Sequence, residues 1–280
     1  MTTVVIPAHN ESQVIGRLLG QLIPAVADEL NVLVVANGCT DDTAEIAASY
    51  GPGVRVLSVP VASKHAALTA AYHAAADFPR IYVDADVELR ACDVRALAAA
   101  LRQPGVLAAA PERTLATTGS SWPVRWYYDV WARLPEVRSG LWGRGVIAVD
   151  SRGQERLAAL PPLIGDDLAA SLSFAPHERA IVTEARVVVH VPRTVTDLLR
   201  RRIRTATGMA QIERAEYAPE STARTTRSDL AAIIRNEPRM APRVALFVFM
   251  AALARLKARR AVASGDFSTW LRDESSRQNS

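Results

Sequence analysis

The sequence predicts an α/β fold, with a doubly wound, mostly parallel sheet, flanking helices and a C-terminal helical extension. Three observations support this fold class. Apolar runs rich in β-branched residues alternate with helical patterns along residues 1–110. The connections between them are short, as in βαβ units. Hydrophobic residues make up 49% of the 280-residue chain and charged residues 22%, which is typical of a globular protein with a sizeable core.

Strands are predicted where a short apolar run is bounded by turn residues, and helices where apolar residues recur every three or four positions. The predicted strands are 3–6, 32–35, 54–59, 80–83, 106–110, 146–149 and 180–191. The predicted helices are 14–22, 43–50, 64–76, 166–174, 199–208 and 241–260. The first four strands alternate with helices through short connections, which predicts a doubly wound, mostly parallel sheet.

Two carboxylates, Asp84 and Asp86, follow the fourth strand directly. Ligands of open α/β sheets bind just beyond the carboxyl ends of the strands. Paired acids there indicate a divalent cation, Mg²⁺ or Mn²⁺, that is shared with phosphate oxygens. The alternative is a turn in which one aspartate caps the following segment. The loop after the first strand has no Gly-x-Gly-x-x-Gly motif, which argues against a dinucleotide-binding protein.

Three stretches with matching order and spacing resemble the inverting family 2 glycosyltransferases of the GT-A fold. They are Val4-Val5-Ile6-Pro7-Ala8-His9-Asn10-Glu11, Asn37-Gly38-Cys39-Thr40-Asp41-Asp42-Thr43 and Val83-Asp84-Ala85-Asp86. The resemblance implies a nucleotide-sugar donor, with Pro7, Ala8 and Glu11 beside the nucleoside. It also implies that Asn37 faces the base. Asp84, Ala85 and Asp86 would then hold ribose, metal and diphosphate, with Asp86 in direct contact with the metal.

The chain departs from the family pattern at two places near the donor site. Ala36 stands where the family often has an acid, so uracil and guanine both remain open as the base. After Lys64 the common Ala-Leu-Asn-x-Gly pattern is altered, with Thr69 and Ala71 in place of Asn and Gly. Lys64 is a candidate phosphate contact, and a solvated lysine at a helix end is the alternative.

A second acidic pair, Asp166-Asp167, stands at the start of a predicted helix. Helix capping can account for one of the two aspartates. In the resembling family the second acid of such a pair is the general base, which implies this role for Asp167, with Asp166 supporting or replacing it. A base is needed because the acceptor hydroxyl is a poor nucleophile until its proton is removed.

Three further residues are candidates through the same resemblance. His190, at the end of the last strand, is a candidate metal or diphosphate ligand, and a plain strand-end histidine is the alternative. Arg201 and Arg204 fall on the first and fourth positions of the family's Gln-x-x-Arg-Trp element, one helical turn apart, where they can hold a diphosphate of donor or lipid-linked acceptor. Thr205 replaces the tryptophan, which favours single-residue transfer over processive synthesis.

An aromatic cluster in residues 122–142 contains four of the five tryptophans. Aromatic faces pack on sugar rings or polyprenyl chains, so the cluster can be the floor of an acceptor site. An aromatic core under a long loop is the alternative.

The charge of the chain is uneven, because residues 193–280 hold 17 Lys and Arg against 9 Asp and Glu. A basic end of this kind favours phosphate groups or an anionic membrane surface, and no nucleic-acid-binding signature is present. Residues 241–260 combine an apolar run with basic residues, so this helix can lie in a membrane interface or pack on the catalytic domain. Two cysteines and the lack of a signal peptide predict a cytoplasmic protein, in solution or peripheral on the inner face of the membrane.

The combined prediction is a metal-dependent inverting glycosyltransferase that moves a sugar from a UDP- or GDP-sugar to an acceptor hydroxyl. Residues 1–110 would form the nucleotide-sugar-binding half, 111–217 the acceptor-binding and catalytic half, and 218–280 the helical extension. The acceptor can be a glycan, a small molecule or a lipid-linked molecule. A nucleotidyltransferase and a degenerate nucleotide-sugar-binding scaffold are the alternatives.

Overall fold

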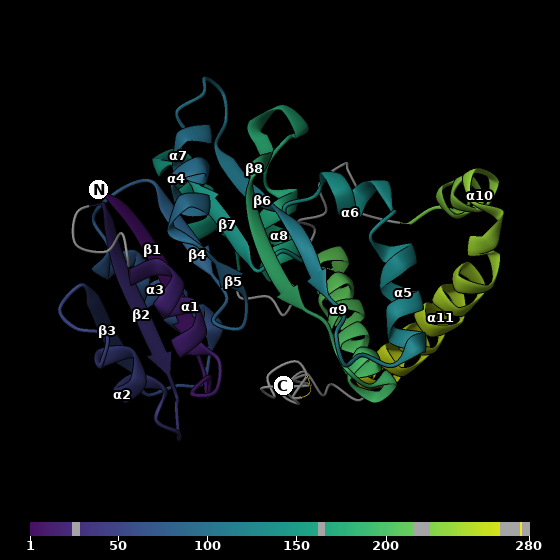
Figure 1. The fold of residues 1–280 in the computed structure, drawn as a ribbon, viewed down its shortest axis with the longest axis horizontal. Coiled ribbons are helices and arrows are strands. Elements are labelled where there is room, and N and C mark those ends of the chain that lie inside the picture. The colour runs from purple at the N-terminus through teal and green to yellow at the C-terminus, as the bar shows by residue number, and fades with distance from the viewer. Residues whose placement is uncertain (24–28, 162–165, 215–224, 264–274, 276–280) are drawn as a thin grey trace.

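One eight-stranded sheet runs through the computed structural model, which describes residues 1–23, 29–161, 166–214, 225–263 and 275. Its strand order is β3-β2-β1-β4-β7-β6-β8-β5 (Figure 1). The strands are β1 (Thr2–Ala8), β2 (Leu30–Asn37), β3 (Val54–Val59), β4 (Arg80–Val83), β5 (Glu88–Leu89), β6 (Ala108–Ala116), β7 (Val146–Val149) and β8 (Arg179–His190).

The first four strands are parallel, as their alternation with helices predicts. β6 and β8 are also parallel, whereas β7 runs antiparallel to β4 and β6, and β5 runs antiparallel to β8. An apolar run predicts a strand but not its direction, so sequence patterns do not reveal the two antiparallel strands. The carboxyl ends of β1, β2 and β4 meet at one edge of the sheet.

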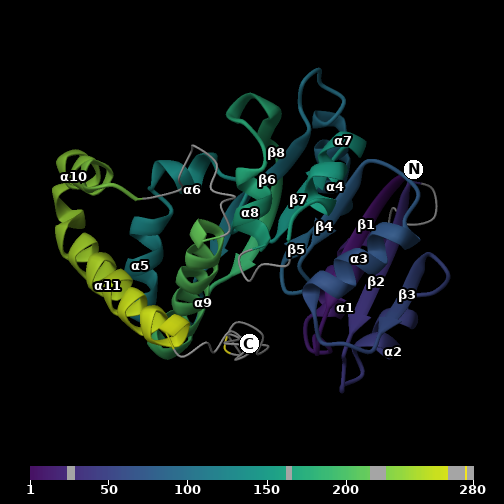
Figure 2. The ribbon, with the colours of Figure 1, turned by 180° about the vertical axis from the view of Figure 1, so that it is seen from behind.

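Helices cover both faces of the sheet (Figures 1 and 2). On one face Val4 and Ile6 of β1 pack with Leu18 of α1, and on the other face Val5 packs with Ala67 of α3. The first face carries α1 (Ile15–Leu22), α2 (Thr43–Ala48) and α4 (Ala91–Ala100), and the second carries α3 (Lys64–Ala74) and α7 (Ser151–Ala158). Burial of alternate residues on opposite faces is what a doubly wound sheet requires.

The remaining helices all come after β6 in the chain. They are α5 (Trp122–Trp131), α6 (Pro135–Ser139), α8 (Asp166–Leu172), α9 (Val195–Arg214), α10 (Arg227–Asn236) and α11 (Ala241–Ala263), with short 3-10 turns at Pro176–Glu178 and Pro238–Met240. α5, α9, α10 and α11 share their own hydrophobic cluster, in which Tyr127 stacks on Phe247 with ring centroids 4.8 Å apart.

The aromatic cluster of residues 122–142 begins with a helix, α5, and not with a long loop. Tyr127, Tyr128 and Trp131 are buried between α5 and the C-terminal helices, so much of the cluster is core. The alternative interpretation was right about an aromatic core but wrong about the loop, because consecutive aromatic residues hide the helical period of the buried positions.

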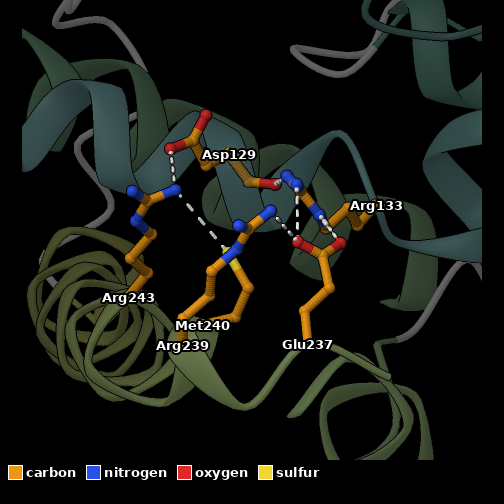
Figure 3. Close-up of polar contacts among 6 residues, drawn as sticks. All are labelled: Asp129, Arg133, Glu237, Arg239, Met240 and Arg243. Atoms are coloured by element: carbon orange, nitrogen blue, oxygen red, sulfur yellow. Dashed lines mark hydrogen bonds and ion pairs between the residues drawn. The ribbon is translucent and has the colours of Figure 1, made fainter. Parts of the chain in front are cut away.

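Ion pairs fasten the C-terminal helices to α5 (Figure 3). Arg243 of α11 lies 2.8 Å from Asp129, and Arg133 lies 3.0 Å from Glu237 at the turn before α11. Arg239 adds a contact of 3.3 Å to the same glutamate. These pairs and the shared apolar cluster hold α10 and α11 to the rest of the molecule.

α11 leaves part of its apolar surface uncovered. Val248, Phe249 and Leu256 are among the exposed large hydrophobic residues. Within the described ranges, no helix combines the length and apolar character needed to cross a bilayer.

Candidate functional site

The candidate site is a cleft beyond the carboxyl ends of β1, β2 and β4, made of two adjoining cavities. The smaller one has a volume of about 310 Å³ and the larger one about 800 Å³. All the predicted site residues except Ala8 line the smaller cavity: Pro7, Glu11, Asn37, Lys64, Asp84, Ala85, Asp86, Asp166, Asp167, His190, Arg201 and Arg204. The side chain of Ala8 belongs to the hydrophobic core beneath α1.

The acidic pair after β4 is anchored by the backbone. The amide of Asp84 donates a hydrogen bond of 2.8 Å to the carbonyl of Gly145, just before β7. Gly145 has a φ of +66°, and a Cβ there would lie 2.6 Å from Val87 and 3.3 Å from Oδ2 of Asp84. Only glycine fits this approach without strain, so the backbone of the residue before β7 can lie directly against the acidic pair.

Lys64 joins the two acidic pairs. Its Nζ lies 2.9 Å from Oδ1 of Asp84 and 2.9 Å from Oδ2 of Asp166. Desolvation in the cleft works to lower the pKa of Lys64, but the two carboxylates outweigh it and raise that pKa above its usual value. Lys64 is therefore a fixed cation inside the site and not a solvated lysine at a helix end.

Asp167 lies at the start of α8, and two backbone amides hold its side chain in place. Gly143 N–H donates to its Oδ2 over 3.1 Å, and Leu168 N–H donates to its Oδ1 over 2.8 Å. The residue is exposed and lines both cavities of the cleft. Desolvation and the neighbouring charge of Asp166 raise the pKa of Asp167, against the opposite effect of Lys64.

The loops after β1 and β2 are tied to each other. The side-chain amide of Asn37 donates to the carbonyl of Ala8 over 2.8 Å, and the ring of His9 lies 2.7 Å from the carbonyl of Asn37. The amide of Glu11 donates to the Thr43 hydroxyl over 2.8 Å. Pro7, Glu11 and Asn37 thus lie together on one rim of the smaller cavity. His9 lines the same rim, although the sequence patterns did not single it out.

His190 lies in the smaller cavity with its Nε2 2.7 Å from Oε1 of Glu88. Arg17 approaches the same carboxylate at 3.5 Å. Burial works to raise the pKa of Glu88, but the hydrogen bond from His190 and the charge of Arg17 outweigh it and lower that pKa. His190 is therefore positioned by an acid that the sequence patterns did not identify.

Arg201 and Arg204 of α9 line the smaller cavity as well. Thr205, which stands where the family often has tryptophan, donates its hydroxyl to the carbonyl of Arg201 over 2.9 Å. The hydroxyl of Thr205 is thus bonded to its own helix, and the residue forms part of the cavity wall.

The donor set around Asp84 and Asp86 suits a hard divalent cation that also binds phosphate. The described residues contain no group of three or more His, Cys, Asp and Glu placed to hold a metal ion by themselves. Asp84 keeps 41% of its side chain exposed to the cleft. Mg²⁺ and Mn²⁺ sites with one or two carboxylates take their other ligands from phosphates and water, so these residues fit a cation that arrives with a diphosphate.

The larger cavity adds residues that motif analysis missed. Its wall includes Tyr82 and Gln154, which share a hydrogen bond of 2.6 Å, and apolar side chains from α3, α7 and α8. No spacing rule links Tyr82 and Gln154, because Tyr82 lies in β4 whereas Gln154 lies in α7, after the antiparallel strand β7. Both cavities meet at Lys64, Asp84, Asp166 and Asp167.

Several solved structures have a similar fold. One is the mannosyltransferase PcManGT from Pyrobaculum calidifontis in complex with GDP-Man and Mn²⁺, with 22% identity, a TM-score of 0.60, and coverage of 94% of this chain and 79% of that one. Another is glucosyl-3-phosphoglycerate synthase from Mycobacterium tuberculosis with phosphoglyceric acid, with 23% identity, a TM-score of 0.58, and coverage of 79% and 81%. A further structure of that synthase, with Mn²⁺, UDP-Glc and phosphoglyceric acid, has 24% identity, a TM-score of 0.57, and the same coverage.

No curated protein sequence matches the chain. The profile of glycosyl transferase family 2 matches residues 3–153, more than half of its length. This stretch contains β1, β2, β4 and the first acidic pair, Asp84 and Asp86. With a GT-A fold and this match, the chain is a glycosyltransferase and belongs to glycosyl transferase family 2.

Proposed function

We propose that the enzyme is a metal-dependent inverting glycosyltransferase that moves a hexose from UDP- or GDP-sugar to an acceptor hydroxyl. The observation that carries this proposal is the Lys64 bridge, which brings Asp84 and the Asp166-Asp167 pair to one cleft. An inverting displacement needs leaving-group stabilisation and a base on opposite sides of one carbon. The complexes of similar proteins with GDP-Man and Mn²⁺, or UDP-Glc and Mn²⁺, add support.

In the proposed donor half of the cleft, the residues bind the nucleoside and the metal. Pro7, Ala8 and Glu11 border the nucleoside, with Ala8 acting through its backbone, and Asn37 faces the base. A divalent cation held by Asp86 and Asp84 would neutralise the charge that grows on the departing diphosphate. Ala85 lies between these acids.

The cationic residues bind the diphosphate in this proposal, and the second acidic pair supplies the base. Lys64, Arg201 and Arg204 contact the diphosphate, and His190 is placed beside it by Glu88. Asp167 takes the proton of the acceptor hydroxyl as that oxygen attacks, and Asp166 fixes Lys64 next to it. The two amides that bind the carboxylate of Asp167 keep its orientation fixed during the transfer.

These roles divide the chain into three functional parts. We assign donor binding to residues 1–110, acceptor binding and catalysis to 111–217, and the helical extension to 218–280. Residues 215–224, 264–274 and 276–280 lie outside the described part of the chain. Val248, Phe249 and Leu256, with Arg255 and Lys257 on the same helix, favour peripheral contact of α11 with an anionic membrane, at the cytoplasmic face.

Calorimetric titration with UDP and with GDP, each with and without Mn²⁺, tests the proposal. Metal-dependent binding of one nucleotide is expected, and Asp86→Ala should abolish the metal dependence. Glu155→Ala is the matched control, because it removes an exposed carboxylate on α7 that lies outside both cavities. If neither nucleotide binds under any of these conditions, the donor assignment is wrong and a degenerate scaffold becomes the better interpretation.

A further inference from the structure

Two buried polar groups lack hydrogen-bond partners at the helical end of the smaller cavity. They are the hydroxyl of Tyr127, whose residue is 0% exposed, and Nε of Arg202. Within the described residues neither atom forms a hydrogen bond. Tyr127 and Arg202 both line the smaller cavity. Leaving such a group without a partner costs about 1–3 kcal/mol, so a native structure keeps it only for a reason such as a ligand.

The surroundings of the Tyr127 hydroxyl are cationic. The guanidinium of Arg202 lies 5.7 Å from the centre of the Tyr127 ring, and Arg255 of α11 lines the same cavity. No ion pair is formed by Arg202 or Arg255 within the described ranges. Burial raises the pKa of Tyr127 to about 12 despite the opposing charge of Arg202, so the hydroxyl keeps its proton and acts as a donor. We call these three residues the Tyr127 pocket.

The Tyr127 pocket lies away from the donor end of the cleft. Its residues come from α5, α9 and α11, which Figures 1 and 2 show on the far side of α8 from β1 and β2. The nucleoside rim, with Glu11 and Asn37, is built on β1 and β2. In both views α8, which begins with Asp166 and Asp167, lies between these two groups of elements (Figures 1 and 2). A ligand of the Tyr127 pocket is thus on the acceptor side.

The chemistry of the pocket selects an anion. Arginine offers a planar fork of N–H donors that matches the oxygens of a phosphate, and a protonated phenol adds one more donor. Two arginines in the wall of one cavity favour a phosphate over a neutral hydroxyl, since a phosphate compensates their charge and a neutral group does not.

Resting on the proposed function, we infer that the acceptor carries a phosphate group, which Tyr127, Arg202 and Arg255 bind while the acceptor hydroxyl reaches Asp167. The phosphate stays on the acceptor and takes no part in bond making. It fixes the acceptor at one end, so that the nucleophilic oxygen is presented to the base at the other.

The test uses two phosphate probes on the full-length protein, with and without saturating nucleotide and Mn²⁺. Glycerol 3-phosphate represents a soluble phosphorylated acceptor, and n-decyl phosphate, kept monomeric, represents a lipid phosphate. Calorimetry should show binding of at least one probe that persists when the nucleotide is bound. Tyr127→Phe and Arg202→Gln should each weaken it about tenfold. Arg259→Gln is the matched control, because it removes an exposed arginine of α11 outside both cavities.

Thermal unfolding of the same variants separates binding from folding. Tyr127→Phe should leave the midpoint unchanged or raise it, since the change removes a buried hydroxyl that has no partner among the described residues. The inference is overturned if neither probe binds, if the nucleotide displaces the probes, or if Tyr127→Phe lowers the midpoint without changing probe affinity. Nucleotide binding without probe binding would overturn this inference alone, whereas loss of nucleotide binding would overturn the proposed function.

Discussion

The parallel half of the sheet and the C-terminal helices contribute to one cleft in different ways. In the parallel half, side chains reach the site because strands end at one edge, and hydrogen bonds such as that from Asn37 to Ala8 hold them. In the helical part, positions far apart in the chain meet by helix packing, as with Asp129 and Arg243, which are 114 residues apart. Strand ends leave a motif in the sequence, whereas helix packing leaves only scattered apolar positions.

The largest effect is expected at the junction of the two regions. Asp167→Asn should lower kcat by about 10²–10⁴-fold, because the acceptor hydroxyl loses its base. Nucleotide affinity should stay close to that of the wild type. Steady-state kinetics and calorimetry on the same preparation measure both quantities. Asp166→Asn serves as the comparison, and a greater loss of kcat there than in Asp167→Asn would reverse the roles of the two acids.

The second prediction tests whether the helical part of the molecule unfolds independently of the sheet. Phe247→Ala should lower the free energy of unfolding by about 3–5 kcal/mol, because it removes the ring stacked on Tyr127 from a buried cluster. Leu18→Ala beneath β1 should cost about 2–5 kcal/mol. Denaturant unfolding followed by tryptophan fluorescence and by circular dichroism should give one coincident transition for both variants. Separate transitions would show that the two regions fold independently.

The third effect concerns pH. The pKa of Asp167 is raised, so kcat should fall as pH drops through a value above the ordinary aspartate range, where the base becomes protonated. Lys64 acts to lower this pKa. Lys64→Met should therefore move the acid limb of the kcat profile to higher pH. A profile that stays in place in Lys64→Met would mean that the limb belongs to another group.

The smallest effect tests the ion pairs of Figure 3. Arg243 and Asp129 are both partly exposed, so their coupling should be only about 0.2–1 kcal/mol. A double-mutant cycle with Asp129→Asn and Arg243→Gln, read by chemical denaturation, measures it. High salt should reduce the coupling further. A coupling well above this range would mean that charge, and not apolar packing, fastens the extension.

The sequence predicted most of the strands, because apolar runs bounded by turn residues are a simple pattern. The roles of the donor-side residues stay predictions, although the structure places these residues around one cavity. The sequence did not predict α4, whose alanine-rich stretch has little amphipathic contrast, or the antiparallel direction of β7. The link from Lys64 to Asp166 depends on how α3 and α8 approach each other. The sequence marked Tyr127 only as a member of the aromatic cluster and did not single out Arg202 or Arg255, since these three residues meet only through the packing of α5, α9 and α11.

The match to the family profile ends before β8 begins. The profile match ends at residue 153, yet β8, at Arg179–His190, pairs with β6 along most of its length and is the strand against which β5 forms. A fragment that stops at the boundary would expose the edge of β6 and leave β5 unpaired, an arrangement that invites aggregation. The matched segment thus does not contain the whole sheet, and any shortened form of the chain made for expression should extend past β8.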